Sequence, residues 1–255
     1  MRSWLQWVCL LAVGVSVTLM VALVAVQVSY TGGGEALSTL GDRDILQAIW
    51  LSAWTSVIAS VAALVLAVPT GYALARWRFR GAWLVEALLL IPVTMSPLAL
   101  GVALLLLFRN PPGEWLARFF VFETPGIILA QFFVAYALTV LVIRATMASI
   151  DVRYEQVARF LGCTPWQAFR RVTLPLARNG IVAGFVLGWA RSIGDFGSTS
   201  TLAGAVKGYT ETMPVAIYLN MASVSIDRAV ALSIVLTLVT VLGLIAVRLL
   251  VGGQR

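Results

Sequence analysis

Long stretches without a charged residue constrain the fold of this chain more than any other feature of its sequence. No charge occurs between Arg2 and Glu35, and residues 45–75 carry none either. Both stretches exceed the roughly 20 apolar residues that cross a bilayer, and the first is longer than the apolar core of about 7–15 residues in a secretory signal. We therefore interpret the first stretch as a retained transmembrane helix, with cleavage as a signal as the alternative.

Six apolar runs follow one another along the chain and predict an all-α membrane protein with six transmembrane helices. Only 11% of the residues are charged, against about 25% in a soluble domain. The predicted helices are residues 4–30, 45–75, 83–108, 126–143, a fifth that begins at Gly180, and 229–247. Pro92 and Pro97 predict kinks in the third helix. We treat residues 1–255 as one transmembrane domain.

The net charge of +7 comes from 18 Lys and Arg residues against 11 Asp and Glu. Twelve of the basic residues fall on one side of the predicted helices and five on the other, with Arg191 inside a helix. The positive-inside rule therefore predicts that both termini and residues 151–175 lie in the cytoplasm, near anionic lipid. No basic stripe interleaved with aromatic residues occurs, so we expect no nucleic-acid partner. Cys9 and Cys163 lie far apart and the chain has no His, so we expect no metal site.

Residues 151–175 are polar and predict two short helices with a tight corner. Asp151 can cap the first helix, and Gly162 can end it in the left-handed conformation. Thr164 can cap the second helix, with a proline at the first helical position and Gln167 three residues after the cap, which is a capping box. Pro175 is expected to stop the second helix. The sequence therefore predicts a hairpin outside the bilayer that needs a partner to hold it.

If this chain moves a solute, the sequence indicates that its energy comes from another protein. It lacks the Gly-x-x-x-x-Gly-Lys-Ser/Thr loop that binds ATP phosphates, and its apolar runs hold few carboxylates for a proton relay. Apolar side chains at helical spacing on the hairpin suit a groove on a separate ATPase: Val157, Phe160, Leu161, Trp166, Phe169 and Val172. Charged side chains would form the rim of that contact: Glu155, Arg159, Arg170 and Arg171. The alternative is that the apolar residues only pack back on the membrane helices.

The fifth predicted helix combines small residues with an intramembrane charge pair. Small side chains recur at every fourth position and allow helices to approach closely in lipid: Gly180, Gly184, Gly188 and Ser192. Arg191 and Asp195 then lie four residues apart at a depth where charge is costly, and Gly194 and Gly197 predict a broken helix. One interpretation is a self-neutralising pair that holds the helices together. The other is that Arg191 faces a permeation path and favours an anion.

The spacing within the hairpin resembles the EAA loop of ATP-binding-cassette (ABC) importer permeases. That pattern is Glu-Ala-Ala, three residues, Gly, nine residues, and Ile-x-Leu-Pro. This chain places its Glu one position early and keeps the other landmarks in register, with Val at the Ile position: Glu155, Ala158, Gly162, Val172, Leu174 and Pro175. It departs from the pattern at Gln156 and Val157, where small residues are usual.

Two further segments, residues 190–197 and 213–218, resemble the oxyanion importer permeases, with the molybdate/tungstate permeases nearest and the sulfate/thiosulfate ones next. Members of this family often carry Glu where Asp195 stands. The resemblance implies a non-enzymatic homodimer in the cytoplasmic membrane, with a solute-binding protein and two ATP-binding subunits that hold ATP and magnesium. No cofactor is expected in this chain.

The resemblance also implies two sets of functional residues. We expect ATPase coupling from Glu155, Ala158, Phe160, Leu161, Gly162, Trp166, Phe169, Arg170, Leu174 and Pro175. We expect the translocation path to include Arg191, Gly194, Asp195 and Gly197.

Residues 210–222 are too short to span a bilayer and predict a short or re-entrant helix on the outer side, with a plain surface helix as the alternative.

Two other classes of function fit part of the sequence. A secondary transporter or channel that works without an ATPase would carry coupling carboxylates in mid-membrane and a visible internal repeat. Asp195 and the marginal Glu86 come closest to such carboxylates. A membrane anchor for a cytoplasmic enzyme would account for the hairpin but not for a charged, glycine-broken fifth helix.

Overall fold

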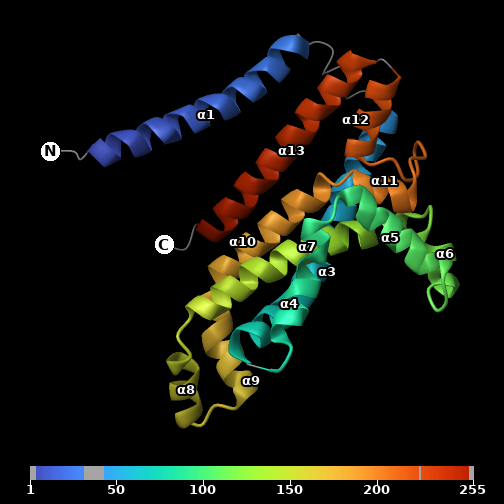
Figure 1. The fold of residues 1–255 in the computed structure, drawn as a ribbon. Helices are drawn as coiled ribbons and strands as arrows, with labels where there is room; N and C mark the ends of the chain where they lie inside the picture. The colour runs from blue at the N-terminus through green and yellow to red at the C-terminus, as the bar shows by residue number, and fades with distance from the viewer. Residues whose placement is uncertain (1–3, 32–42, 78, 224, 253–255) are drawn as a thin grey trace.

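The computed structural model describes residues 4–31, 43–77, 79–223 and 225–252, and the regular elements in this part of the chain are helices (Figure 1). Five of them are long and apolar enough to cross a membrane, or six if a bent pair is counted as one span. The five are α1 (Trp4–Thr31), α3 (Arg43–Arg76), α7 (Thr124–Ser149), α10 (Leu174–Ile193) and α13 (Ile226–Gly252). The prediction of an all-α membrane protein is therefore confirmed. Both chain ends lie outside the described residues, so the predicted location of the termini stays a prediction.

Helices α3, α7 and α10 form the centre of the molecule, because small residues allow them to pack closely. A Cβ atom added to α10 at Gly180, Gly184 or Gly188 would lie in close contact with α7. Thr139 of α7 donates a hydrogen bond to the backbone carbonyl of Gly184 at 3.2 Å. Ser192 reaches Ser60 of α3 at 3.1 Å. The predicted small-residue stripe is thus a helix-packing surface.

Helix α1 lies apart from this centre in Figure 1, and its nearest element is α13. Its central segment, residues 6–27, buries none of its apolar surface against the rest of the chain. A helix that is apolar on all sides and uncovered by protein suits a lipid environment.

The third predicted span is broken rather than kinked. Helices α4 (Ala82–Thr94) and α5 (Pro97–Arg109) meet at an angle of 113°. Ser96 is extended because the residue before a proline avoids the helical region, and its hydroxyl accepts a hydrogen bond from the Ala99 N–H at 3.2 Å. Pro92 remains inside α4. The predicted interruption at Pro97 is therefore present, as a sharp break at Met95 and Ser96 rather than a kink, whereas Pro92 does not end α4.

The fifth predicted span begins earlier than Gly180, because Pro175 does not stop the preceding helix. Helix α9 (Pro165–Ala168) continues through a π-helical turn, η1 (Phe169–Thr173), into α10. In that turn the Leu174 N–H bonds to the Phe169 carbonyl, five residues back. The wider turn accommodates a proline that has no N–H to donate. Residues 165–193 thus form one helical stretch.

Beyond Ile193 the chain breaks as predicted. Gly194 ends α10, and the short helix α11 (Gly197–Ala203) follows after Asp195 and Phe196. Three other short helices are α6 (Glu114–Phe120), which lies between the predicted spans 83–108 and 126–143, α8 (Arg153–Phe160), and α12 (Met213–Ala222). The short helix expected within residues 210–222 is therefore present.

Candidate functional site

The predicted caps of the hairpin are present. The Asp151 carboxylate accepts a hydrogen bond from the Arg153 N–H at 2.9 Å, and Gly162 has a φ of 91°, which favours glycine. Thr164 and Gln167 form a capping box. The Thr164 N–H donates to the Gln167 side chain at 2.9 Å, and the Gln167 N–H donates to the Thr164 hydroxyl at 3.3 Å. Local hydrogen bonds therefore set the corner between α8 and α9.

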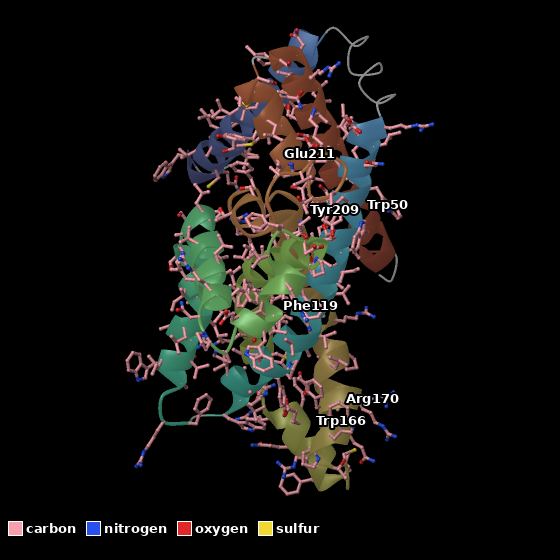
Figure 2. The ribbon with its side chains drawn as sticks, turned by 90° about the vertical axis from the view of Figure 1, so that its right-hand side faces the viewer. Trp50, Phe119, Trp166, Arg170, Tyr209 and Glu211 are labelled. Carbon is pink, nitrogen blue, oxygen red and sulfur yellow. The ribbon has the colours of Figure 1, made fainter. Side chains whose placement is uncertain are left out.

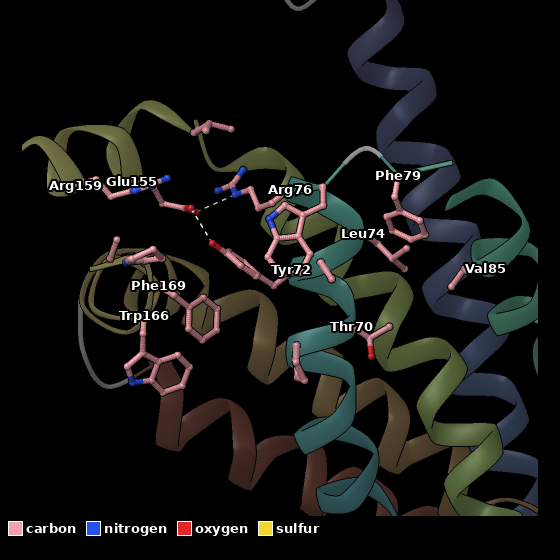
Figure 3. Close-up of a pocket in the computed structure, with 16 residues that line it drawn as sticks. Thr70, Tyr72, Leu74, Arg76, Phe79, Val85, Glu155, Arg159, Trp166 and Phe169 are labelled. Carbon is pink, nitrogen blue, oxygen red and sulfur yellow. Dashed lines mark hydrogen bonds and ion pairs between the residues drawn. The ribbon is translucent and has the colours of Figure 1, made fainter. Parts of the chain in front are cut away.

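Glu155 faces the membrane helices, so its predicted place on an exposed rim is wrong. Its carboxylate accepts hydrogen bonds from the Tyr72 hydroxyl at 2.9 Å, from Arg76 Nε at 2.9 Å and from the Thr173 hydroxyl at 2.7 Å (Figure 3). Arg76 also donates from Nη1 to the Ile150 carbonyl at 2.9 Å. A buried carboxylate persists only when it is paired and hydrogen-bonded, and Glu155 meets this condition by fastening α8 to α3 and η1.

The tip of the hairpin exposes apolar side chains. Phe160, Leu161 and Trp166 are 89%, 81% and 66% exposed, and Figure 2 shows Trp166 and Arg170 at the end of the molecule away from Glu211. Phe169 is half-buried, with its ring 4.6 Å from that of Tyr72 and 5.6 Å from that of Trp166. The remaining predicted coupling residues divide: Ala158 is buried, Leu174 is half-buried, and Gly162 and Pro175 are exposed.

The two broken spans meet at their breaks. Gly197 at the start of α11 packs against Pro97 and Leu98 at the start of α5, and a side chain added to Gly197 would lie 2.8 Å from the Leu98 nitrogen. Gly101 of α5 packs in the same way on Ser198 of α11. A cavity of about 350 Å³ opens beside this crossing and is lined by Ser96, Pro97, Leu98, Arg191, Gly194, Asp195, Phe196 and Gly197. The four predicted path residues therefore all line one cavity.

Arg191 and Asp195 form a loose pair within this cavity. Arg191 Nη1 lies 3.8 Å from Asp195 Oδ1, and the side chains are 39% and 0% exposed, respectively. The other carboxylate oxygen, Oδ2, accepts hydrogen bonds from the Ser198 hydroxyl and, at 3.1 Å, from the Thr199 N–H. Within the described part of the chain, Oδ1 has no hydrogen-bond partner. Asp195 is thus held by its own turn, while the guanidinium of Arg191 remains accessible.

A second, smaller cavity of about 260 Å³ lies at the end of the molecule opposite the hairpin. It is lined by residues of α3 and of the loop before α12: Gln47, Ala48, Trp50, Leu51, Trp54, Gly208, Tyr209 and Glu211. Burial raises the pKa of Glu211 above its ordinary value of 4.5, opposed by Lys207 and reinforced by Asp44. The hydrogen bond that Tyr209 donates to Glu123 raises the Tyr209 pKa.

The structure adds residues to the site that sequence patterns did not reveal. Tyr72 and Arg76 bind Glu155 across 83 and 79 residues of sequence, and no local signal joins these positions. Ser198 and Thr199 hold Asp195, and Ser96 before Pro97 carries the sequence signal of a helix cap. No group of three or more His, Cys, Asp or Glu side chains among the described residues could hold a metal ion.

Spans broken at glycine and proline, a cavity lined by Arg191 and Asp195 at their crossing, and a hairpin fastened outside the bundle are together the features of a multi-pass membrane transport subunit. The chain belongs to the ABC importer permeases: the family model of the binding-protein-dependent transport system inner membrane component matches residues 67–254. The predicted family is therefore confirmed.

Similar proteins carry different substrate names. The chain is 34% identical over 249 residues to the molybdenum transport system permease protein ModB of Mycobacterium tuberculosis, which covers 95% of this chain and 93% of ModB. It is 34% identical to the sulfate transport system permease protein CysW of Escherichia coli K12, over 85% of this chain and 78% of CysW. It is 33% identical to the probable transport system permease protein NifC of Clostridium pasteurianum, over 87% of this chain and 79% of NifC.

Solved structures share the fold. The crystal structure of a bacterial ABC transporter involved in the import of the acidic polysaccharide alginate matches with a TM-score of 0.75 at 17% identity, over 97% of this chain and 94% of that one. The same transporter class in complex with alginate pentasaccharide-bound periplasmic protein matches with a TM-score of 0.73 at 18% identity. The all-helical permease fold is thus shared despite low sequence identity.

Proposed function

We propose that this chain forms the membrane path of an ATP-driven importer for a tetrahedral oxyanion, with molybdate or tungstate as the favoured substrate. The observation that carries the proposal is Arg191, a partly exposed guanidinium that lines a 350 Å³ cavity where two broken spans cross. ModB, a relative over almost its whole length, is named for molybdenum transport. The second candidate is sulfate or thiosulfate, and it is supported by CysW, which is named for sulfate transport.

The electrostatics of the crossing suit a small anion. Arg191 is the cation among the residues that line the cavity. Helix α5 begins at Pro97 beside it, and the N-terminus of a helix carries partial positive charge and free N–H groups. Asp195 supplies the opposing charge, but one of its oxygens is occupied by Ser198 and Thr199. An oxyanion that enters the cavity would therefore compete with a single carboxylate oxygen for Arg191.

The hairpin is the proposed contact with two ATP-binding subunits, which would hold ATP and magnesium. Its tip presents Phe160, Leu161 and Trp166 to solvent, as an anchor for a protein groove requires. We further propose a homodimer in the cytoplasmic membrane, with the hairpin and both termini in the cytoplasm. A solute-binding protein on the other side is supported by the alginate transporter, whose structure was solved with a substrate-bound periplasmic protein.

Uptake by membrane vesicles tests the proposal. Arg191→Gln is expected to lower uptake of labelled molybdate about tenfold or more, because a hydrogen bond to a charged group contributes about 1.5–3 kcal/mol. Arg191→Lys, which keeps the charge, should retain a larger share of the activity. Competition by unlabelled tungstate and sulfate ranks the candidate substrates. Normal uptake by a correctly inserted Arg191→Gln protein would contradict the proposal.

Recovery of the tagged chain from membranes tests the proposed assembly. Co-purification of an ATP-binding subunit is expected, and Phe160→Asp at the exposed tip should abolish it without unfolding the chain. Transport of solute by the purified chain alone, in liposomes without a second polypeptide, would contradict the need for an ATPase.

A further inference from the structure

A third cavity, larger than the two described above, lies at the base of the hairpin, away from the crossing of the broken spans. It has a volume of about 870 Å³ and lies between the end of α3, the start of α4 and the two hairpin helices. Figure 3 shows Arg76 and Tyr72 directed toward Glu155 on one side, with Leu74, Phe79 and Val85 on the other. The cavity therefore has a polar end and an apolar end.

The polar end offers an unsatisfied cationic group. The side chain of Arg76 is only 6% exposed, and its Nε and Nη1 are bound to Glu155 and to the Ile150 carbonyl. Its Nη2 has no hydrogen-bond partner in the described part of the chain. Arg159 lines the same end and is exposed, so the lining there holds two guanidinium groups and one carboxylate, that of Glu155. The excess positive charge suits an anionic ligand such as a phosphate.

The apolar end lies between the end of one apolar helix and the start of the next. Helix α3 ends at Arg76 and α4 begins at Ala82, and the sequence predicts that the segment between them lies at the boundary between hydrocarbon and headgroups. Trp77 and Trp166, which line it, are side chains typical of this boundary. Leu74, Phe79 and Val85 continue the apolar lining from there along the start of α4.

We propose that this cavity binds one anionic phospholipid from the leaflet on the hairpin side of the membrane. The phosphate would pair with Arg159 beside the buried Arg76 guanidinium, and an acyl chain would lie along Leu74, Phe79 and Val85. A free inorganic anion would pair with Arg159 but leave the apolar wall exposed. An apolar protein segment would cover the wall but leave Arg159 without an anionic partner. A phospholipid satisfies both ends.

The bound lipid would contact α3, α4, α8 and α9 together, because residues from all four line the cavity. It would therefore brace the hairpin against the membrane helices at the same place where Glu155 fastens it. We expect anionic lipid to raise the thermal stability of the hairpin region, whichever solute the protein transports.

Native mass spectrometry of the purified full-length chain, titrated with phosphatidylglycerol or phosphatidylcholine, tests this site. The wild-type chain should retain phosphatidylglycerol in preference to phosphatidylcholine. Arg159→Gln should weaken phosphatidylglycerol binding about fivefold, the effect of removing one basic residue near a lipid surface. Val85→Trp, which fills the apolar end without changing a charge, should displace both lipids. Arg153→Gln is the matched control, since Arg153 is an exposed arginine on the same helix that does not line this cavity.

Two results would overturn the proposal. The first is equal retention of the two lipids by the wild-type chain, Arg159→Gln and Val85→Trp, which would leave the cavity to another protein surface. The second is displacement of phosphatidylglycerol by inorganic phosphate at millimolar concentration, which would assign the arginines to a free anion. Neither result bears on uptake through the crossing of the broken spans, so this proposal and the proposed function fail separately.

Discussion

Two acid–arginine pairs in this molecule share their chemistry but differ in how they are held. Glu155 and Arg76 approach to 2.9 Å, and both side chains are largely buried. Asp195 and Arg191 lie 3.8 Å apart, and the arginine is 39% exposed. Glu155 also receives hydrogen bonds from Tyr72 and Thr173 on two other elements, whereas the additional partners of Asp195 come from its own turn.

The difference separates a structural pair from one that a ligand can open. Opening the first pair would leave two charges buried between α3 and α8, which is costly. Opening the second would expose a guanidinium that already reaches a cavity, while Asp195 keeps Ser198 and Thr199. The accessibility of the arginine therefore distinguishes the two roles better than the presence of an ion pair does.

The largest effect is expected from Glu155→Ala. It leaves Arg76 buried without its carboxylate, and breaking a buried pair in this way costs about 3–5 kcal/mol. Thermal unfolding of the purified protein, followed by tryptophan fluorescence, measures the loss. Glu86→Ala is the control, since the Glu86–Arg144 pair at 2.7 Å is partly exposed and should contribute no more than about 1 kcal/mol. Equal losses in the two variants would remove the distinction between the pairs.

A smaller effect, on function rather than stability, is expected from Asp195→Asn. The amide can keep a hydrogen bond from Thr199 but no longer attracts Arg191, so the anion meets less competition. We expect the half-saturating anion concentration for uptake to fall about fivefold, with a change in stability of no more than about 1 kcal/mol. Ser198→Ala, which leaves the charge of Asp195 in place, serves as the control. A loss of stability comparable to that of Glu155→Ala would show that the second pair is structural as well.

The smallest effect concerns a third buried carboxylate, Glu211, which has no arginine at hydrogen-bond distance among the described residues. Because burial raises its pKa, the folded chain binds this proton more tightly than the unfolded chain does. Its contribution to stability should be complete below pH 4.5 and lost as the pH rises through the raised pKa. Glu211→Gln should remove this part of the pH dependence of thermal unfolding, an effect below about 1 kcal/mol.

The same pH series on Glu114→Gln, which changes an exposed carboxylate on α6, should match the wild-type chain. If Glu211→Gln also matches the wild-type chain, burial alone does not perturb a carboxylate at this end of the molecule.

Local signals in the sequence were sufficient where neighbouring residues determine the structure. The caps at Asp151, Gly162 and Thr164, the break at Gly194 and the glycine packing of α10 all follow from spacings of a few residues. The four residues predicted for the path were found to line one cavity because they lie close together in sequence, at the end of a helix and its break. The family resemblance also rested on such short spacings.

The sequence was insufficient where distant segments or competing local rules decide the outcome. From the sequence, Glu155 is expected at the surface, because its partners Arg76 and Tyr72 belong to the distant helix α3. Pro175 and Pro97 are both helix breakers in isolation, yet only Pro97 follows a break, because a π turn accommodates Pro175. Sequence spacing therefore does not show which of the two prolines a helix can accommodate.

The helical stretch from Pro165 to Ile193 connects the hairpin to the cavity at the crossing of the broken spans. One end carries Trp166 at the tip of the hairpin, and the other ends at Gly194 beside Arg191. Under the proposed function, a displacement of Trp166 by an ATP-binding subunit would be carried along this helix to Gly194, where the helix ends. The tip of the hairpin and the cavity at the crossing lie at the two ends of one helical stretch.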